Sequence, residues 1–362
     1  MFGLFWGSWA ACLPAIQRAT GATDTQLGLA LLCVALAALP AMLVAGRLAD
    51  AFGGARLVPI FLVFFGLVAT LPGLARSVGM LVVFLALIGV ATGLLDISIN
   101  SHASRLEALH GVRIMDGLHA SFSGGVVVGG VGAGLLRHAG AHPSWILAVV
   151  AVVGASAAFV NRGPYPEPAP RQRRGRLERP LVVVGLVLAL AFLVENGLEA
   201  WSALFLERTL NSGPAVSGLG PGLFAGAMLT GRVLAQKVDW PSVPGRMLFA
   251  GLASATGLAI AATSQHAAVA LAGFVIAGGG LALSAPTLFG LAGRLGGEGG
   301  RGAALSTVAI LGYLGFVAGP ALIGAVSGAS SLRGGFLFLC AVAVVLAACA
   351  PILRRVVGET GG

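Results

Sequence analysis

Charged residues are scarce in this chain of 362 residues, at 10% of the sequence, whereas hydrophobic residues make up 57%. A soluble protein carries about 25% charged residues, so the composition excludes a soluble globular protein. The net charge of +9 does not indicate nucleic-acid binding, because the arginines lie in short loops beside apolar runs and not on a polar domain. The sequence therefore predicts an integral membrane protein, with the lipid bilayer as its surroundings.

The signatures of several enzyme and cofactor sites are also missing. The four cysteines, Cys12, Cys33, Cys340 and Cys349, fall inside apolar runs and none belongs to a CxxC pair, so neither a disulfide framework nor a zinc site is indicated. There is no Walker loop for ATP and no HExxH motif of a metalloprotease. We therefore expect no cofactor, no metal site, no catalytic residues and no enzymatic activity.

The apolar residues form continuous runs, which predict helices, because an alternating pattern would be needed for a membrane barrel. We expect an all-α integral membrane protein. Twelve transmembrane helices are predicted at residues 2–17, 27–48, 57–75, 78–101, 117–136, 144–160, 181–206, 216–235, 247–264, 267–291, 303–326 and 333–353.

The distribution of basic residues predicts how these helices are oriented. If the odd-numbered connections lie outside the cell, five of the six outer loops carry a single basic residue each, and the other 17 of the 22 Lys and Arg residues lie inside. Positive residues are retained on the cytoplasmic side during insertion, so both termini are predicted to be cytoplasmic. The outer residues are Arg18, Arg76, Arg137, Arg208 and Arg333.

A polar, proline-rich and arginine-rich segment at 161–179 predicts a flexible cytoplasmic linker between residues 1–160 and 180–362. Each of these parts would hold six helices. Several identical pairs of residues recur at nearly one sequence offset, among them Gly46-Arg47 and Gly231-Arg232. The pattern predicts a duplication into two six-helix bundles, related as a parallel repeat about an axis along the membrane normal.

The connection between the second and third predicted helices, from Gly46 to Arg56, resembles the GxLaDrxGrr loop of the major facilitator superfamily. It departs from that pattern at Ala51 and Gly54. An acid at a helix N-terminus is favoured by the helix dipole, and such a contact can break and reform. The resemblance implies the major facilitator fold and, together with the second Gly-Arg pair, a gate formed by Gly46, Asp50, Gly53, Arg56 and Arg232.

Three further segments, at 93–100, 118–125 and 195–202, resemble an uncharacterised YbjJ-like bacterial group, which is similar to the fucose–proton symporter branch of that superfamily. Asn196 and Ala200 depart from the glycine and aspartate expected there. The resemblance implies a multi-pass transporter of the bacterial inner membrane.

Asp96, Glu195 and Glu199 are the acids that fall well inside predicted helices. An acid at mid-depth costs about 2.5–3.5 kcal/mol on insertion scales, so such a residue either functions or anchors a paired structure. Glu195, Glu199 and Ser202 fall on one helical stripe, as do Gly93, Asp96 and Asn100. In the facilitator fold, the helices that carry these stripes line the central cavity. We therefore assign proton coupling to the three acids.

Polar and aromatic residues near the acids are candidates for binding a solute. A histidine titrates near neutral pH, and aromatic rings suit a sugar or another organic solute, although tryptophan also packs in cores or at the membrane interface. No Lys or Arg falls well inside a predicted helix, so an anionic solute would meet the acids without a counter-charge. The candidate substrate-binding residues are Asn100, His119, Asn196, Trp201 and Trp9.

These observations favour a monomeric secondary active transporter that couples protons to the movement of a small neutral polar solute, sugar-like, by alternating access. The alternative is a proton-driven exporter of a hydrophobic or cationic compound. A remote alternative is an intramembrane serine hydrolase, with Ser121 or Ser123 as nucleophile and His102 or His119 as base.

Overall fold

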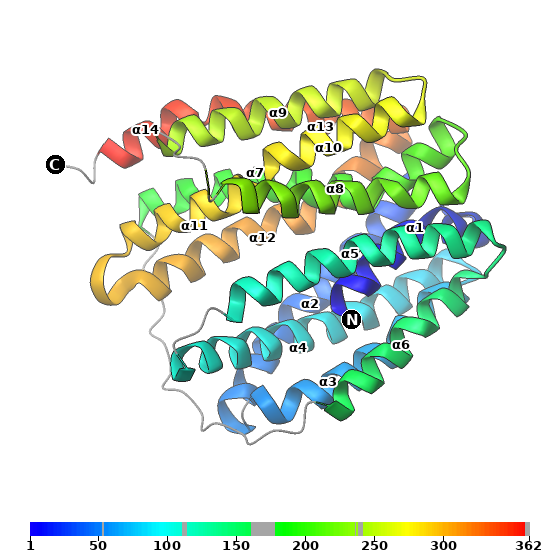
Figure 1. The fold of residues 1–362 in the computed structure, drawn as a ribbon, viewed down its shortest axis with the longest axis horizontal. Coiled ribbons are helices and arrows are strands. Elements are labelled where there is room, and N and C mark those ends of the chain that lie inside the picture. Colours follow the sequence, from blue (N-terminus) through cyan, green and yellow to red (C-terminus); the bar gives the residue numbers. More distant parts are fainter. Residues whose placement is uncertain (53, 111–113, 161–177, 236, 238–241, 359–362) are drawn as a thin grey trace. The chain divides into compact units, whose positions relative to one another are not determined.

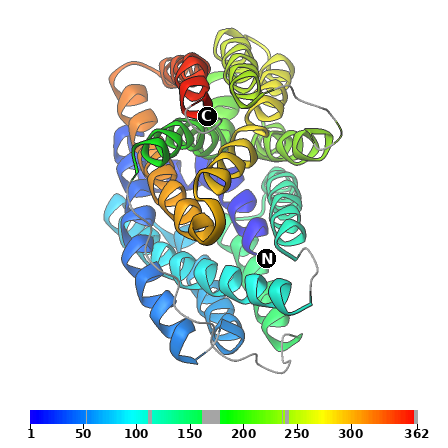
Figure 2. The same ribbon diagram turned by 90° about the vertical axis from the view of Figure 1, so that its left-hand side faces the viewer.

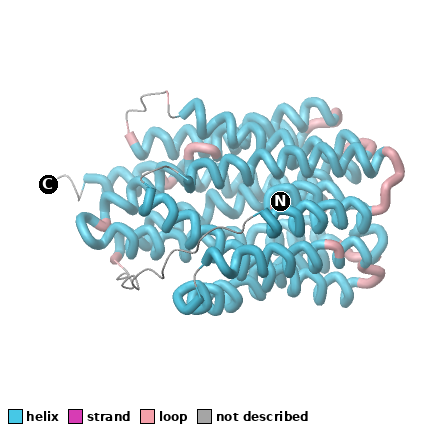
Figure 3. Tube along the Cα trace, turned by 60° about the horizontal axis from the view of Figure 1, so that its bottom comes forward, coloured by secondary structure: helices cyan, strands magenta, loops and turns pink. Residues whose placement is uncertain are grey.

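The computed structural model describes residues 1–52, 54–110, 114–160, 178–235, 237 and 242–358. Within these residues the chain folds into helices and short connections, without β-strands (Figure 3). By contacts it divides into two compact units, Met1–Arg171 with Gly213–Gly222, and Gln172–Ser212 with Leu223–Gly362. The helix α8 therefore contributes its first part to one unit and its remainder to the other.

The first unit contains the helices coloured blue to green in Figure 1. Glycine 21, with φ of 65°, ends α1 in the left-handed conformation that favours glycine. A short 3₁₀ turn, η1 (Leu71–Leu74), prolongs α3. The helices are α1 (Phe2–Thr20), α2 (Asp24–Phe52), α3 (Gly54–Ala69), α4 (Val78–His110), α5 (Ile114–His138) and α6 (Pro143–Val160).

Glycines bring the helices of this unit close together. Gly93 of α4 lies against the backbone of α2, where an added Cβ would come within 2.5 Å of the Ala38 carbonyl oxygen. The two helices run side by side in both views (Figure 1 and Figure 2). Gly129 of α5 similarly contacts the carbonyl of Leu4 in α1. Such close approach is how membrane helices associate without a hydrophobic driving force between them.

The second unit contains the helices coloured green to red in Figure 1. A π-helical turn, η2 (Phe205–Thr209), extends α7. The hydroxyls of Ser242 and Ser331 cap α9 and α13, where they accept from the N–H groups of Gly245 and Gly334 in the first turn. The helices are α7 (Arg179–Leu204), the part of α8 (Pro214–Ala235) from Leu223 onward, α9 (Val243–Thr263), α10 (Ala267–Leu281), α11 (Ser284–Leu295), α12 (Gly297–Ala329), α13 (Leu332–Ala348) and α14 (Ala350–Gly358).

Two of the predicted transmembrane helices are interrupted. The span predicted at 267–291 is one membrane segment, but within it α10 ends at Leu281 and α11 begins at Ser284. Pro286 has no N–H to donate to the carbonyl of Ala282, and a run of glycines just before the break weakens the helix further. The predicted helix at 333–353 likewise divides into α13 and α14 at Cys349.

The remaining spans follow the prediction. Nine helical segments in the described part of the chain are long and apolar enough to cross a membrane, counting α10 with α11 and α13 with α14 as one each. The three other predicted spans correspond to α1, α6 and α8. The chain is therefore an all-helical membrane protein with the twelve spans that the apolar runs predict.

Candidate functional site

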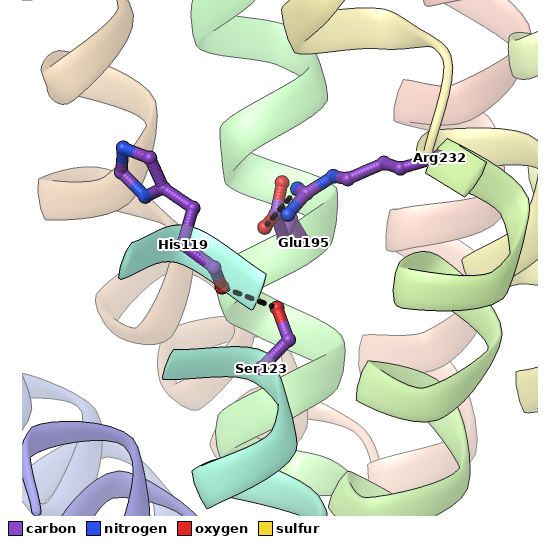
Figure 4. A network of polar contacts seen from close by, with 4 residues as sticks. All are labelled: His119, Ser123, Glu195 and Arg232. Carbon is purple, nitrogen blue, oxygen red and sulfur yellow. Dashed lines mark hydrogen bonds and ion pairs between the residues drawn. The ribbon is translucent and has the colours of Figure 1, made fainter. Parts of the chain in front are cut away.

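Charged side chains of the second unit meet between α7 and α8. Gly231 packs α8 against the end of α10, since a Cβ at this position would come within 2.7 Å of the Ala282 side chain. Arg232, the next residue, reaches Glu195 of α7, with 3.6 Å between its Nη2 and the Glu195 Oε1 (Figure 4). The two side chains are 30% and 16% exposed. The ion pair is thus largely withdrawn from solvent but remains accessible.

This ion pair corrects one interpretation of the sequence. Arg232 lies in the last turn of α8, close to its end, and was therefore not counted among residues well inside a helix. Its long side chain carries the guanidinium to the middle of α7, because the apolar stem of an arginine packs along the helix while its head reaches a polar partner. The acids of this unit therefore have a counter-charge. The Nε of Arg232 is buried and has no hydrogen-bond partner among the described residues.

Glu199 lies one turn from Glu195 and is also half-buried. The predicted stripe ends there, because Ser202 is fully buried and its hydroxyl donates to the carbonyl of Glu199 at 3.4 Å. Two carboxylates and one guanidinium therefore form the accessible charged group of this unit. We call Glu195, Glu199 and Arg232 the charged cluster.

Asn196, a candidate for binding the solute, makes an interhelical contact instead of standing free. Its Nδ2 donates to the carbonyl of Phe316 in α12 at 2.7 Å. One of its two amide hydrogens is thereby committed to the backbone of a neighbouring helix. Trp201 is fully buried, and its indole N–H has no partner among the described residues. This position suits packing within the unit better than contact with a solute.

In the first unit, Asp96 and Asn100 of α4 form a local pair. The Asn100 Nδ2 donates to the Asp96 carboxylate at 3.0 Å and to its carbonyl at 2.8 Å, and both side chains are half-buried. Gly93, on the same predicted stripe, is used for packing against α2. Gly93, at one end of the stripe, therefore packs against a neighbouring helix, whereas Asp96 and Asn100 place a carboxylate and an amide further along it.

Trp9 of α1 is 2% exposed and lies in an aromatic core. Its ring stacks on Phe5 at 6.5 Å between centroids, and Phe5 in turn meets Phe65 of α3 edge to face at 5.0 Å. This arrangement is typical of core packing, which the sequence left open as the second interpretation of the tryptophans. Trp6, on the same helix, is half-buried.

His119 of α5 has an exposed side chain. The hydroxyl of Ser123 donates to the main-chain carbonyl of His119 at 3.2 Å, while the imidazole ring points away from Ser123 (Figure 4). A nucleophilic serine needs its hydroxyl bonded to the base, so this pair lacks the geometry of a hydrolase. The remote hydrolase alternative finds no support from the Ser123–His119 pair.

The predicted gate lies only partly within the described residues. Gly53 and the side chain of Asp50 are outside them, and Arg56 is exposed. A Cβ added to Gly46 would meet no described atom within 4 Å, so this glycine makes no close helix contact with the described residues. Arg232 was also predicted to belong to the gate, and the structure identifies Glu195 as its partner.

Sequence reasoning missed two features of this site. It did not identify Phe316 as a partner of Asn196, nor Glu195 as a partner of Arg232. A signal for the first was present, because Pro320 lies four residues after Phe316 and so leaves its carbonyl without a helical donor. A signal for the second was the Gly231-Arg232 pair itself, which was interpreted only as part of a repeat and of a gate.

The family model described as Major Facilitator Superfamily matches residues 1–314. An uncharacterised MFS-type transporter of Yersinia pestis is 28% identical over 362 residues, which cover 98% of this chain and 93% of that protein.

Two solved transporters share the fold. A bacterial homologue of the human lysosomal transporter Spinster, inward-facing and unoccupied, aligns with a TM-score of 0.76 at 16% identity, over 99% of this chain and 95% of that chain. The nucleoside transporter NupG aligns with a TM-score of 0.74 at 12% identity, over 98% and 96%. With the twelve spans and the family match, these likenesses show that the chain belongs to the major facilitator superfamily and is a multi-pass membrane protein that carries out secondary transport.

Proposed function

We propose that this protein is a proton-coupled transporter of a small neutral polar solute, sugar-like, that works by alternating access. The charged cluster carries the proposal. Two carboxylates and one guanidinium withdrawn from solvent leave one negative charge uncompensated when all three groups are ionised. Binding one proton makes the cluster neutral. The protein can then change between its two access states at a lower electrostatic cost, because no net charge stays within the membrane at the cluster.

The members of the cluster have different roles in this proposal. Arg232 favours the ionised form of Glu195 through their direct contact at 3.6 Å, because an adjacent positive charge stabilises a carboxylate. Glu199, whose carboxylate forms no ion pair with Arg232 in the described part of the chain, is the group that exchanges the proton. Asp96 supplies a second exchangeable carboxylate, in the first unit, where Asn100 holds it by a hydrogen bond.

The charges of the cluster also indicate which class of solute can bind. A permanently anionic solute would add to the excess negative charge, whereas a neutral solute with several hydroxyls can accept from Arg232 and donate to carboxylates. One relative in fold, NupG, is a nucleoside transporter, and a nucleoside is a solute of this class. His119 and Asn100 add polar groups that can bond such a solute.

The test is transport by purified protein in liposomes under an imposed pH gradient. The probes are fucose, a polyol and uridine, with a lipophilic cation as the probe for the exporter alternative. We expect one neutral probe to accumulate with the inward proton gradient, and Glu199→Gln to abolish accumulation while equilibrium exchange continues. Accumulation by Glu199→Gln equal to wild type would overturn the coupling role, and transport of the cation alone, against the proton gradient, would favour the exporter.

Three further features belong to this proposal. Both termini lie in the cytoplasm, the protein works as a monomer in the bacterial inner membrane, and it belongs with the YbjJ-like group. The distribution of basic residues supports the orientation. Cysteine labelling of a single-cysteine variant at Arg76, in a predicted outer loop, tests it: labelling of intact cells by an impermeant reagent is expected.

A further inference from the structure

Pro320 leaves a backbone carbonyl without its helical donor inside α12. In an α-helix the N–H of residue 320 would donate to the carbonyl of residue 316, but proline has no N–H. Within a membrane there is no water to replace that hydrogen bond, and an unpaired carbonyl costs free energy. The carbonyl of Phe316 therefore needs a donor from elsewhere in the protein.

Asn196 of α7 supplies that donor. Its Nδ2 lies 2.7 Å from the Phe316 oxygen, which is close for an amide hydrogen bond. The Phe316 ring also meets Phe192, one turn earlier on α7, edge to face at 4.7 Å. Phe192 and Asn196 thus both face α12 and contact Phe316. Phe192 contacts the Phe316 ring, and Asn196 donates to the Phe316 carbonyl.

Small residues of α12 make this approach possible. A Cβ on Gly319 would come within 2.9 Å of the Leu193 carbonyl oxygen, and a Cβ on Gly315 would clash with the carbonyl of Ala189. The two backbones are therefore in contact on either side of Phe316. A short side chain such as asparagine can span the distance only because the helices lie this close.

The contact sets the rotation of α7 about its own axis. Successive residues of a helix are rotated by about 100° around its axis. Viewed down α7, Glu195 and Glu199 are therefore both rotated in the same sense, by about 60–100°, from Asn196, which faces α12. Sliding or rotating α7 by one residue would move both carboxylates to a different face and would separate Glu195 from Arg232. The hydrogen bond at Phe316 opposes that movement.

We propose that Asn196 is a positioning residue, which fixes the face of α7 that carries Glu195 and Glu199 by donating to the carbonyl that Pro320 frees in α12. This inference concerns the second unit alone and does not depend on which solute or ion is transported. It assigns Asn196 a role different from direct substrate contact.

A double-mutant cycle with Pro320 tests the proposal in the full-length protein. Asn196→Leu removes the donor, and we expect the midpoint of thermal unfolding, Tm, to fall by about 2–6 °C. In Pro320→Ala the alanine N–H serves the Phe316 carbonyl, so adding Asn196→Leu is expected to change Tm little. Ser202→Ala is the matched control on α7, because its effect should be equal in both backgrounds.

A second readout reports the carboxylates themselves. Dicyclohexylcarbodiimide reacts with protonated carboxyl groups, and mass spectrometry measures its attachment at Glu195 and Glu199. We expect Asn196→Leu to shift the pH dependence of this labelling and Pro320→Ala to restore it, which a loss of stability alone would not do. Equal effects of Asn196→Leu in both backgrounds, on Tm and on labelling, would overturn the proposal.

A further variant keeps the test decisive if Pro320→Ala does not fold. Asn196→Asp preserves the shape of the side chain but, when ionised, cannot donate. We expect it to lose stability as Asn196→Leu does, whereas Asn196→Gln, which keeps a donor, should lose less. Full stability of Asn196→Asp above neutral pH would contradict the proposal.

Discussion

Breaking the ion pair between Glu195 and Arg232 should destabilise the protein more than removing both charges. The pair is separated by 3.6 Å and its side chains are 16% and 30% exposed. At an effective dielectric constant of about 20, two unit charges at this distance attract each other by roughly 4–5 kcal/mol, and removing one partner of a buried pair costs about 3–5 kcal/mol. Because Arg232 keeps some exposure, we expect a cost near the lower end, about 3 kcal/mol.

The perturbations are Glu195→Gln, Arg232→Gln and the double variant. A cost of about 3 kcal/mol corresponds to a fall in Tm of roughly 6–12 °C in each single variant. The double variant replaces the ion pair by two neutral amides that can hydrogen-bond, so its Tm should recover most of the loss. Thermal unfolding of purified protein in detergent, followed by near-ultraviolet circular dichroism, measures all three.

The outcome that refutes this reasoning is additivity. If the double variant loses as much stability as the two single variants together, the charges do not interact in the folded protein. High salt gives a control, because a largely buried pair is screened less than a surface pair. The coupling should therefore persist at 1 M salt.

Asp96→Asn should abolish proton-driven accumulation of the transported solute while sparing exchange at equal concentrations, and undiminished uphill uptake in liposomes would contradict this. Asp50→Asn should slow transport with the fold retained, as judged by turnover and by cysteine accessibility from the inner side, and unchanged values of both would exclude a latch. Gly129→Ala should cost about 1–3 kcal/mol, because its methyl group meets the Leu4 carbonyl, whereas Gly132→Ala on the same helix meets nothing within 4 Å. Equal Tm values for the two glycine variants would show that α1 and α5 can separate without cost.

The membrane class, the twelve spans and the candidate acids could be predicted because each depends on local composition. A run of apolar residues partitions into lipid whatever its neighbours are, and an acid within such a run is conspicuous because its insertion is costly. The interruption near Pro286 could not be predicted in the same way. Proline is often tolerated inside membrane helices, and only the surrounding packing decides whether the helix bends or stops.

The roles of individual side chains depended on the tertiary structure. By spacing alone, Trp9 and Asn196 were as suitable for a solute as Glu195, but Trp9 is packed in an aromatic core and Asn196 is bonded to α12. Arg232 was expected only at a gate, yet its guanidinium lies beside Glu195. Helical periodicity gives the angle between residues of one helix, but not the direction in which that helix faces.

The sequence by itself thus determined that the chain crosses the membrane as a set of helices and carries a few carboxylates within them. The tertiary structure alone decided which groups partner those carboxylates and which polar side chains are taken up by packing. The physical reason is that insertion depends on the free energy of each segment in lipid, whereas partners depend on how separate helices pack, as α7 does with α8 at Glu195 and Arg232 and with α12 at Asn196 and Phe316.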